Sequence, residues 1–253
     1  MTDRSARFRA FAALHIPGDP IILYNAWDGG SASVIAEAGA KAIATGSASV
    51  AAAHGFADAE ALPLDLALAN AERVVAAVDL PVTIDFEGGY AADPDGVAAN
   101  MRRLAETGAV GCNFEDQVVG GEGLHPIAVQ AERIRAAREA AGEAFFINAR
   151  TDIFLKAKLE THDSAMVEAA LERAIAYGEA GASGFFVPLL ADLDLLARFC
   201  EACPLPVNFM AFPGAPDAGA VAAAGAARIS HGPFPYKAAM NALRAEAEAV
   251  YAS

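Results

Sequence analysis

The sequence has few cysteines and lacks the long apolar runs of membrane proteins. Three cysteines in 253 residues are too few for a disulfide framework, so we expect a reducing, cytoplasmic setting. No stretch of about 18 apolar residues without charges occurs, so no membrane span is expected. The first ten residues, MTDRSARFRA, contain no apolar core of the length that a signal peptide needs.

Basic residues are also scarce. The chain has 18 Lys and Arg against 32 Asp and Glu, which gives a formal charge of −14 and a pI near 4.7. Nucleic acid binding needs a surplus of Lys and Arg on some face, so we expect no nucleic acid partner. A small carboxylate substrate is compatible with this charge, since one local arginine can hold it. With 55% hydrophobic residues, the chain can bury a large core, which excludes disorder.

One local pattern recurs along the chain. A small residue, Gly and Ala precede a short β-type run at 38–40, 107–109, 180–182 and 224–226. Each instance follows a helix-like stretch, and a glycine there supplies the left-handed residue that ends a helix. The apolar run that comes next is typical of a buried strand. The pattern therefore predicts repeated helix-to-strand junctions of an α/β protein.

Eight strands are predicted on this basis. Their ranges are 20–25, 41–45, 81–86, 110–115, 144–149, 183–187, 206–210 and 227–231. The segments between them carry apolar residues at three- and four-residue spacings, as helices packed on a sheet do. The clearest of these helical segments are 92–107, 128–141, 164–180, 191–202 and 236–251. Eight β/α units in about 250 residues predict a (β/α)8 TIM barrel.

We expect this barrel to form a single domain over residues 1–253, with an extra N-terminal helix over 5–15, because no linker divides the chain. The competing fold is a doubly wound open sheet. That fold would need fewer strands and usually a glycine-rich phosphate turn after the first one. The segment 25–31 reads NAWDGGS, which does not match the GxGxxG pattern of such a turn.

Polar side chains follow the predicted strands, and active sites of (β/α)8 barrels lie at that end of the strands. Asp85 and Glu87 are two residues apart, so on a continuing strand they face the same side, and Glu115 ends the next strand. Three carboxylates in one pocket disfavour one another's ionisation, and a hard cation such as Mg²⁺ resolves this. The alternative is that the first two cap the following helix and Glu115 pairs with an arginine.

Two further side chains at strand ends are candidates for chemistry. Arg150 emerges after an apolar run on the fifth strand, and its planar guanidinium suits a substrate carboxylate. The alternative is a structural salt bridge with Glu115 or Asp152. His231, at the end of the eighth strand, is either an acid–base group or a structural histidine. The glycine-rich segment 118–126 is either a closing lid or an ordinary surface loop.

Taken together, the motifs resemble those of one family. In chain order they are YNAWD at 24–28, GS at 46–47, GFAD at 55–58, DFEGGY at 85–90, FEDQ at 114–117, NARTD at 148–152, PVN at 206–208 and RISHGP at 228–233. This ordered set resembles the isocitrate lyase/phosphoenolpyruvate mutase superfamily over residues 5–245. The resemblance implies a (β/α)8 barrel whose last helix is commonly exchanged between subunits. It also implies homodimers or homotetramers and a bound Mg²⁺ or Mn²⁺.

The resemblance assigns a metal-binding role to four acidic residues. It implies that Asp85 binds the metal directly and that Glu87, Glu115 and Asp58 bind it through waters. The family usually has Asp where Glu87 stands. The longer side chain can still reach waters around the metal.

Substrate-binding and catalytic roles also follow from the resemblance. Ser47 and Ala48 are expected to contact the carboxylate of a 2-oxo acid through their backbone, and Arg150 to neutralise oxyanion charge. We expect the pocket to be lined by Tyr24, Trp27 and Asn208. The proton for the enolate is expected from water, Tyr24 or His231.

One departure from the family narrows the expected activity. Isocitrate and methylisocitrate lyases carry a Lys-Lys/Arg-Cys-Gly-His segment soon after Glu-Asp-Gln, and its Cys supplies a proton. Here residues 118–123 read VVGGEG, and the Lys and Asn of the mutase loop are not evident either. We therefore predict a magnesium-dependent lyase that cleaves a C–C bond of a small 2-oxo or 2-hydroxy di- or tricarboxylic acid through an enolate, as oxaloacetate decarboxylases or substituted-malate lyases do. The alternatives are a phosphonomutase-like enzyme of P–C bonds and a barrel that binds a metabolite without catalysis.

Overall fold

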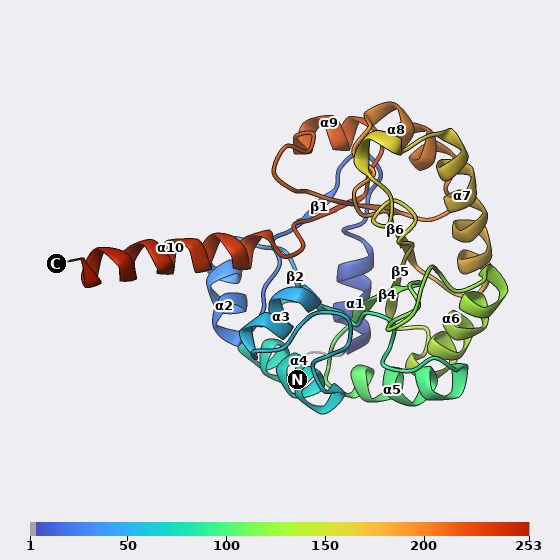
Figure 1. Ribbon diagram of the computed structural model, residues 1–253. Coiled ribbons are helices and arrows are strands. Elements are labelled where there is room, and N and C mark those ends of the chain that lie inside the picture. The colour runs from blue at the N-terminus through green and yellow to red at the C-terminus, as the bar shows by residue number, and fades with distance from the viewer. Residues whose placement is uncertain (1–3, 253) are drawn as a thin grey trace.

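Eight parallel strands form a nearly closed barrel (Figure 1). The computed structural model describes residues 4–252. The strands are β1 Ile21–Leu23, β2 Ile43–Ala44, β3 Val82–Asp85, β4 Gly111–Glu115, β5 Phe146–Arg150, β6 Gly184–Phe186, β7 Val207–Met210 and β8 Arg228–Ser230. They pair in the order β1-β8-β7-β6-β5-β4-β3-β2, and a parallel bridge between Ala26 and Thr45 joins the two ends of that order. The predicted (β/α)8 barrel is thus confirmed.

Helices connect successive strands and surround the barrel, while α1 precedes β1 and α10 follows β8 and projects away from the barrel (Figure 1). They are α1 Arg4–Ala12, α2 Gly29–Glu37, α3 Ser47–Ala53, α4 Leu64–Ala77, α5 Pro94–Glu106, α6 Ile127–Ala141, the 3-10 helix η1 Leu159–Thr161, α7 Ser164–Glu179, α8 Leu193–Ala202, α9 Ala218–Ala223 and α10 Phe234–Tyr251. The helical segments predicted from periodicity correspond to α5, α6, α7, α8 and α10. The expected extra N-terminal helix is α1.

Four glycines explain why the chain turns from helix to strand where the sequence predicts. Gly39, Gly108, Gly181 and Gly225 follow α2, α5, α7 and α9, with φ angles of 99°, 91°, 105° and 95°. A residue with a Cβ rarely adopts these angles, whereas glycine does so without steric cost. Each glycine therefore ends its helix and directs the chain into the next strand.

Helix α1 closes the amino-terminal end of the barrel with a buried aromatic cluster. The ring centroids of Phe11 and Phe146 are 5.4 Å apart, and the imidazole of His15 stacks on Phe146 at 4.3 Å. The Nδ1 of His15 lies 2.9 Å from the carbonyl oxygen of Phe11. Burial in this apolar floor, together with the charge of Arg228, lowers the pKa of His15 to about 3. His15 is therefore neutral in the folded protein near pH 7.

We expect acid to destabilise the fold through His15. In the unfolded chain a histidine binds its proton below about pH 6.5, whereas the buried ring does so only near pH 3. Between these values the unfolded state binds the extra proton, so the free energy of unfolding falls as the pH falls. The expected slope from this residue is up to about 1.4 kcal/mol per pH unit. Urea unfolding across this range should show a slope shallower by that amount in His15→Phe, and equal slopes would contradict the assignment.

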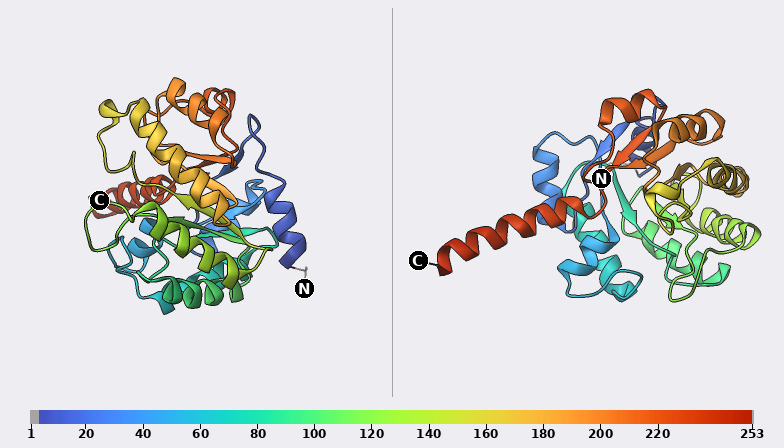
Figure 2. Two further views of the ribbon diagram at one scale, coloured as in Figure 1. Left: turned by 90° about the vertical axis from the view of Figure 1, so that its right-hand side faces the viewer. Right: turned by 45° about the horizontal axis from the view of Figure 1, so that its top comes forward.

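Helix α10 leaves the barrel and ends far from it (Figure 1 and the right view of Figure 2). Within this helix only Pro235, in the first turn, is buried among the residues that the structure describes. Leu243, Val250 and Tyr251 expose large apolar side chains. In the part of the chain from residue 4 to 252, no helix combines the length and the apolar character that crossing a bilayer requires.

Candidate functional site

A cavity of about 310 Å³ opens at the carboxyl ends of the strands. It is lined by residues of β3, β4, β5, β6, β7 and β8 and of the segments that follow β1, β2, β5, β6 and β8. Among the predicted site residues, those that line it are Ser47, Ala48, Asp58, Asp85 and Arg150. The structure therefore brings the predicted direct metal ligand and the predicted catalytic arginine into one space.

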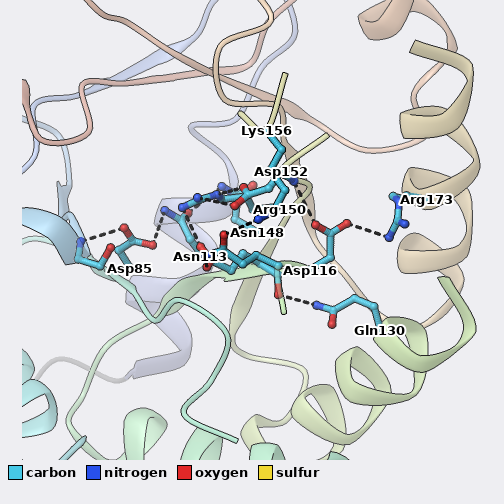
Figure 3. A network of polar contacts seen from close by, with 12 residues as sticks. Asp85, Asn113, Asp116, Gln130, Asn148, Arg150, Asp152, Lys156 and Arg173 are labelled. Atoms are coloured by element: carbon cyan, nitrogen blue, oxygen red, sulfur yellow. Dashed lines mark hydrogen bonds and ion pairs between the residues drawn. The ribbon is translucent and has the colours of Figure 1, made fainter. Parts of the chain in front are cut away.

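Asp85 ends β3, and both of its carboxylate oxygens have partners (Figure 3). Its Oδ2 accepts a hydrogen bond of 2.9 Å from the backbone N–H of Ser47, at the start of α3. Its Oδ1 lies 3.4 Å from the Nδ2 of Asn113, which stands opposite it on β4. The Ser47 N–H, predicted to contact a substrate carboxylate, thus holds Asp85 instead, and Ala48 lines the cavity beside it.

Asp58 lies in the loop between α3 and α4, at the mouth of the cavity. Partial withdrawal from water and the nearby charge of Asp85 raise the pKa of Asp58, while a hydrogen bond from the Ser47 side chain opposes that shift. Ser47 therefore contacts both acids, Asp85 through its backbone and Asp58 through its hydroxyl. A cation near the two carboxylates would relieve their repulsion.

Glu87 follows β3 and adopts a φ angle of 48°, which residues with a Cβ rarely do. Its Oε2 accepts a hydrogen bond of 2.8 Å from the backbone N–H of Glu60, and its Oε1 lies 3.4 Å from the hydroxyl of Tyr90. Burial and the charge of Asp85 raise the pKa of Glu87 to about 7. Glu87 and Asp85 line a smaller hollow beside the main cavity, so the predicted pair is together in the fold.

Glu115 ends β4 and is almost fully buried. Its Oε2 lies 2.8 Å from the Nη1 of Arg150, and its Oε1 accepts a hydrogen bond of 3.0 Å from the Nε2 of Gln117. Burial raises the pKa of Glu115, and the charge of Arg150 opposes this. Glu115 does not line the main cavity among the described residues. Glu115 therefore pairs with an arginine, as the alternative interpretation of the sequence expects.

Arg150 ends β5 and is held by two acids (Figure 3). Besides its contact with Glu115, its Nε and Nη2 bind the two oxygens of the fully buried Asp152, at 2.5 Å and 2.9 Å. Its guanidinium carbon lies 6.0 Å from the ring centroid of Phe186. Burial lowers the pKa of Arg150, but the charges of the two acids outweigh this and raise it above the ordinary value. Arg150 is therefore a fixed, permanently charged group at the cavity wall.

Below the cavity, a network of amides fills the interior of the barrel. The Nδ2 of Asn148 donates to Asn113 Oδ1 at 2.9 Å and to Asn208 Oδ1 at 3.0 Å, and Arg228 Nη2 donates to Asn113 at 3.2 Å. Asn208, predicted to line the pocket, belongs to this buried network. It supports the floor by donating a hydrogen bond of 3.1 Å to Ser230, which does line the cavity.

Tyr24, Trp27 and His231 lie outside the cavity lining. Successive strand residues face opposite sides, and because Leu23 points into the barrel and is fully buried, Tyr24 points outward. The rings of Tyr24 and His231 pack at 5.1 Å near the start of α10. Trp27 packs edge-on against Tyr236 of α10 at 5.3 Å. The predicted roles of these three side chains in the pocket are therefore not supported by their positions.

The donor set fits a hydrated, hard cation. Among the described residues, no group of three or more His, Cys, Asp or Glu side chains converges closely enough to hold a metal ion directly. Mg²⁺ usually keeps several waters and binds through one or two carboxylates, which agrees with one direct ligand, Asp85, and contacts through water to the others. The raised pKa values of Asp58, Glu87 and Glu115 belong to carboxylates that a nearby dication would help to ionise.

Several polar residues that the sequence places at strand ends, without a predicted role of their own, also line the cavity, among them Asn25, Asn113 and Ser230. Asn25 joins the two ends of the strand order, since its Nδ2 donates to Thr45 O at 2.7 Å and its Oδ1 accepts from the N–H of His231 at 2.8 Å. These residues stand at strand ends and on the inward-facing alternate positions, as Asn25 does two residues after Leu23.

Comparisons with known proteins identify the family of this chain. The profile of the phosphoenolpyruvate phosphomutase family matches residues 11–251. The chain is 36% identical to the uncharacterized protein Rv1998c of Mycobacterium tuberculosis H37Rv, over 95% of this chain and 88% of the relative. It is 31% identical to 2-methylisocitrate lyase of Salmonella typhimurium, over 79% and 68% of the two chains. A crystal structure of a candidate phosphonomutase from Burkholderia cenocepacia J2315 superposes with a TM-score of 0.94, at 47% identity and over 97% and 99% of the chains. The chain therefore belongs to the isocitrate lyase/phosphoenolpyruvate mutase superfamily.

Proposed function

We propose that the protein uses Mg²⁺ or Mn²⁺ to cleave a C–C bond of a small 2-oxo or 2-hydroxy di- or tricarboxylic acid through an enolate. The observation that carries this proposal is that Asp85 and Arg150 line the same cavity. Asp85 offers an anionic ligand to a cation, and Arg150 offers a cation to an anion that develops during reaction. Membership of a superfamily with relatives named as lyases and mutases supports an enzyme of this type.

The residues of the cavity have distinct parts in this proposal. When bound, the dication supplies Lewis-acid charge for the substrate oxygens. The 2.9 Å hydrogen bond from Ser47 holds Asp85 in place to receive it. Arg150 is fixed by Glu115 and Asp152, so it meets negative charge where that charge develops, without rearrangement.

Water is the proposed source of the proton that completes the reaction. Tyr24 and His231 lie outside the cavity lining, and among the described residues that form it there is no His, Cys, Lys or Tyr. The segment 118–123, where related lyases carry their proton-donating Cys, contains neither Cys nor Lys. Loss of CO₂ needs no protein base to begin, so this lining is compatible with decarboxylation.

Two other functions are favoured by specific observations. A P–C bond enzyme is favoured by the 47% identity to a candidate phosphonomutase and by the name of the matching family profile. A barrel that binds a metabolite without catalysis is favoured by a lining that has Arg150 and carboxylates but no ordinary proton donor among the described residues.

A substrate panel separates these functions. The protein is incubated in Mg²⁺ with oxaloacetate, 2-methylisocitrate, 2,3-dimethylmalate and phosphonopyruvate, and pyruvate is measured with a coupled dehydrogenase against a blank without protein. In the phosphonopyruvate assay, ADP and pyruvate kinase are added so that phosphoenolpyruvate, the product of a mutase, is also detected. The proposed function predicts pyruvate from at least one of the first three, and loss of that signal in EDTA. Turnover of phosphonopyruvate alone would favour the P–C enzyme. A rise of the thermal midpoint with oxalate and Mg²⁺, without any turnover, would favour the metabolite-binding barrel.

We also propose a cytoplasmic homodimer or homotetramer in which α10 packs against a partner subunit. Leu243 and Val250 of α10 expose 62% and 67% of their surface. On the barrel wall, Ile22 and Tyr24 of the β1 region expose 44% and 46%, although helices normally cover the outside of such a barrel. A helix from a partner subunit would bury both sets of apolar side chains. The cysteines that the structure describes are free thiols, which supports a reducing compartment.

Leu243→Glu is expected to break this assembly. A charge placed in an apolar interface without a partner costs several kcal/mol, so the dissociation constant should rise at least about 100-fold. Light scattering coupled to size exclusion should then give the 26.0 kDa monomer. Glu246→Gln, on the same exposed helix, is the matched control and should leave the mass unchanged. A variant at Leu243 with the mass of the native protein would contradict the proposal.

A further inference from the structure

We propose that Asn113 binds the substrate, by donating a hydrogen bond from its side-chain amide to an oxygen of the acid head. The head is the carboxylate together with the oxygen on the neighbouring carbon. The inference rests on the proposed function, because it takes this head to lie beside Asp85 and the cation. It adds a neutral donor to a cavity in which Arg150 is the one cation among the described residues of the lining.

Asn113 belongs to a polar layer in the interior of the barrel. The strand register places Asp85 beside Asn113 and Asn113 beside Asn148. Such layers are usually filled by branched apolar side chains, and polar groups buried in their place are costly unless they make hydrogen bonds. Asn113 and Asn148 are both buried, but Asn113 also lines the cavity. The hydrogen bonds of the layer therefore decide what Asn113 presents to a ligand.

Arg228 determines which end of the Asn113 amide faces the cavity. Its Nη2 lies 3.2 Å from Asn113 Oδ1, and because a guanidinium carries only donors, the atom that it contacts is the amide oxygen. Burial lowers the pKa of Arg228 to about 10, and the charge of Asp85 opposes that shift, so Arg228 is charged near pH 7. The nitrogen of Asn113 consequently points the other way, toward Asp85.

The neighbouring amides enforce the same orientation. The Nδ2 of Asn208 donates to the backbone carbonyl of Phe209 at 2.6 Å. A carbonyl oxygen only accepts, so Asn208 turns its own oxygen toward Asn148. The Nδ2 of Asn148 then donates to Asn208 at 3.0 Å and to Asn113 Oδ1 at 2.9 Å. The oxygen of Asn113 thus accepts two hydrogen bonds, and a flipped amide would set its nitrogen against two donors.

One N–H of Asn113 remains for a ligand. The amide nitrogen has two hydrogens, and its acceptor in the described part of the chain is Asp85 Oδ1, at 3.4 Å. That distance is long for an N–H···O hydrogen bond. A buried amide donor without a partner is costly, and an oxygen of a substrate head beside Asp85 removes that cost. The position of this N–H is what carries the proposal.

The donor is also fixed before a ligand arrives. Its orientation is set by Arg228 and Asn148, so no rearrangement is needed when negative charge develops on the substrate oxygen. Hydrogen bonds in a chain polarise one another, and this chain receives one of its donors from the cation Arg228. Asn113 therefore supplements Arg150 at the head of the substrate.

Asn113→Leu tests the inference by calorimetric titration with oxalate in saturating Mg²⁺. Leucine has a similar volume and removes the donor without adding a charge. Oxalate should bind at least about tenfold more weakly, because a hydrogen bond to a charged ligand is lost. Titration with Mn²⁺ alone should give a dissociation constant within about threefold of the native value, since Asp85 keeps its hydrogen bond from Ser47 and its charge.

Asn148→Leu is the matched control. It places the same substitution in the same buried layer, but Asn148 does not line the cavity. Arg228 still contacts the oxygen of Asn113, so the donor keeps its orientation. Both variants should lose thermal stability, whereas oxalate should bind to Asn148→Leu within about threefold of the native affinity. Equal weakening of oxalate in the two variants would overturn the inference, because damage to the layer would then explain it.

Asn113→Asp tests the same point even if the leucine variant does not fold. Aspartate keeps an oxygen for Arg228 and Asn148, and it replaces the donor with a second carboxylate oxygen beside Asp85. At about pH 8, where carboxylates are ionised, Mn²⁺ alone should bind at least as tightly as to the native protein. Oxalate should bind at least about tenfold more weakly. Oxalate bound within about twofold of the native affinity would contradict the inference.

The native protein separates this inference from the proposed function. Oxalate binding that requires Mg²⁺, with the same affinity in Asn113→Leu as in the native protein, would remove the role of Asn113 and leave the proposed function standing. Native protein that binds oxalate equally well with and without Mg²⁺, or not at all, would overturn the proposed metal-assisted function, and the inference with it.

Discussion

Replacing Asp85 with Asn should lower kcat/KM on the best substrate of the panel at least about a thousandfold while the protein stays folded. Asn keeps the size of the side chain, and its amide oxygen can take the place of Asp85 Oδ2 in accepting the Ser47 N–H. It removes the negative charge that is expected to bind the dication. A neutral amide oxygen is a much weaker partner for Mg²⁺ than a carboxylate. Without the cation, the charge that develops on the substrate loses its main stabilisation.

Two measurements and a control variant make this prediction specific. Calorimetric titration with Mn²⁺ should show the affinity of the variant reduced at least about 100-fold, and the thermal midpoint should move by only a few degrees. Asp95→Asn is the control, because Asp95 is an exposed acid in the first turn of α5. Turnover by Asp85→Asn within a few fold of the native rate would refute the assignment of Asp85 as the direct ligand.

The fold was open to prediction because its signals are local. A glycine that ends a helix, such as Gly181, and the apolar run after it specify a junction within a few residues. The lengths of the strands were less accessible. The predicted strand 41–45 is reduced to Ile43–Ala44, because β2 pairs fully with β3 alone and meets the β1 side through one bridge. How far a ladder extends depends on its neighbours, which the apolar run does not encode.

The site was also predictable only in part: the sequence indicates which residues end a strand, but not which residues of neighbouring strands pair. Asp85 and Arg150 were predictable, since a charged residue that directly follows an apolar run stands at a strand end. The pairing of Glu115 with Arg150 depends on the register of β4 against β5, which places these residues opposite each other. A shift of one residue would turn the side chains to the other face, and the sequence alone does not fix that register.

Positions just after a strand were the least predictable. Tyr24 and Trp27 stand in a motif that looks like a pocket edge, yet the inward face of this segment belongs to Leu23 and Asn25. The outward side chains instead meet the start of α10. Leu189, which follows β6 and lines the cavity, was missed for a related reason, because a leucine in a loop gives no sign of its positive φ angle. The direction of a side chain in a turn is set by the turn type, and leucine is not a residue that predicts one.

Replacing Arg150 with Lys should damage the protein through its structure as well as its chemistry. Arg150 makes three contacts with two buried acids, at Glu115 and at both oxygens of Asp152. A lysine has one nitrogen and cannot bridge both acids in this geometry. One buried carboxylate then loses its partner, and breaking such a pair costs about 3–5 kcal/mol. We expect the free energy of unfolding to fall by about 3 kcal/mol and kcat/KM to fall at least about 100-fold.

The matched control is Arg103→Lys, which alters an exposed ion pair with Asp65 whose atoms are 2.6 Å apart. Exposed pairs contribute little, so its stability should stay within about 0.5 kcal/mol of the native value. Assays of Arg150→Lys well below its thermal midpoint separate the two effects. Loss of stability with native kcat/KM would reduce Arg150 to a structural ion pair. Loss of both, with the Mn²⁺ affinity unchanged, would place its contribution at the substrate, because the ligand Asp85 would still hold the metal.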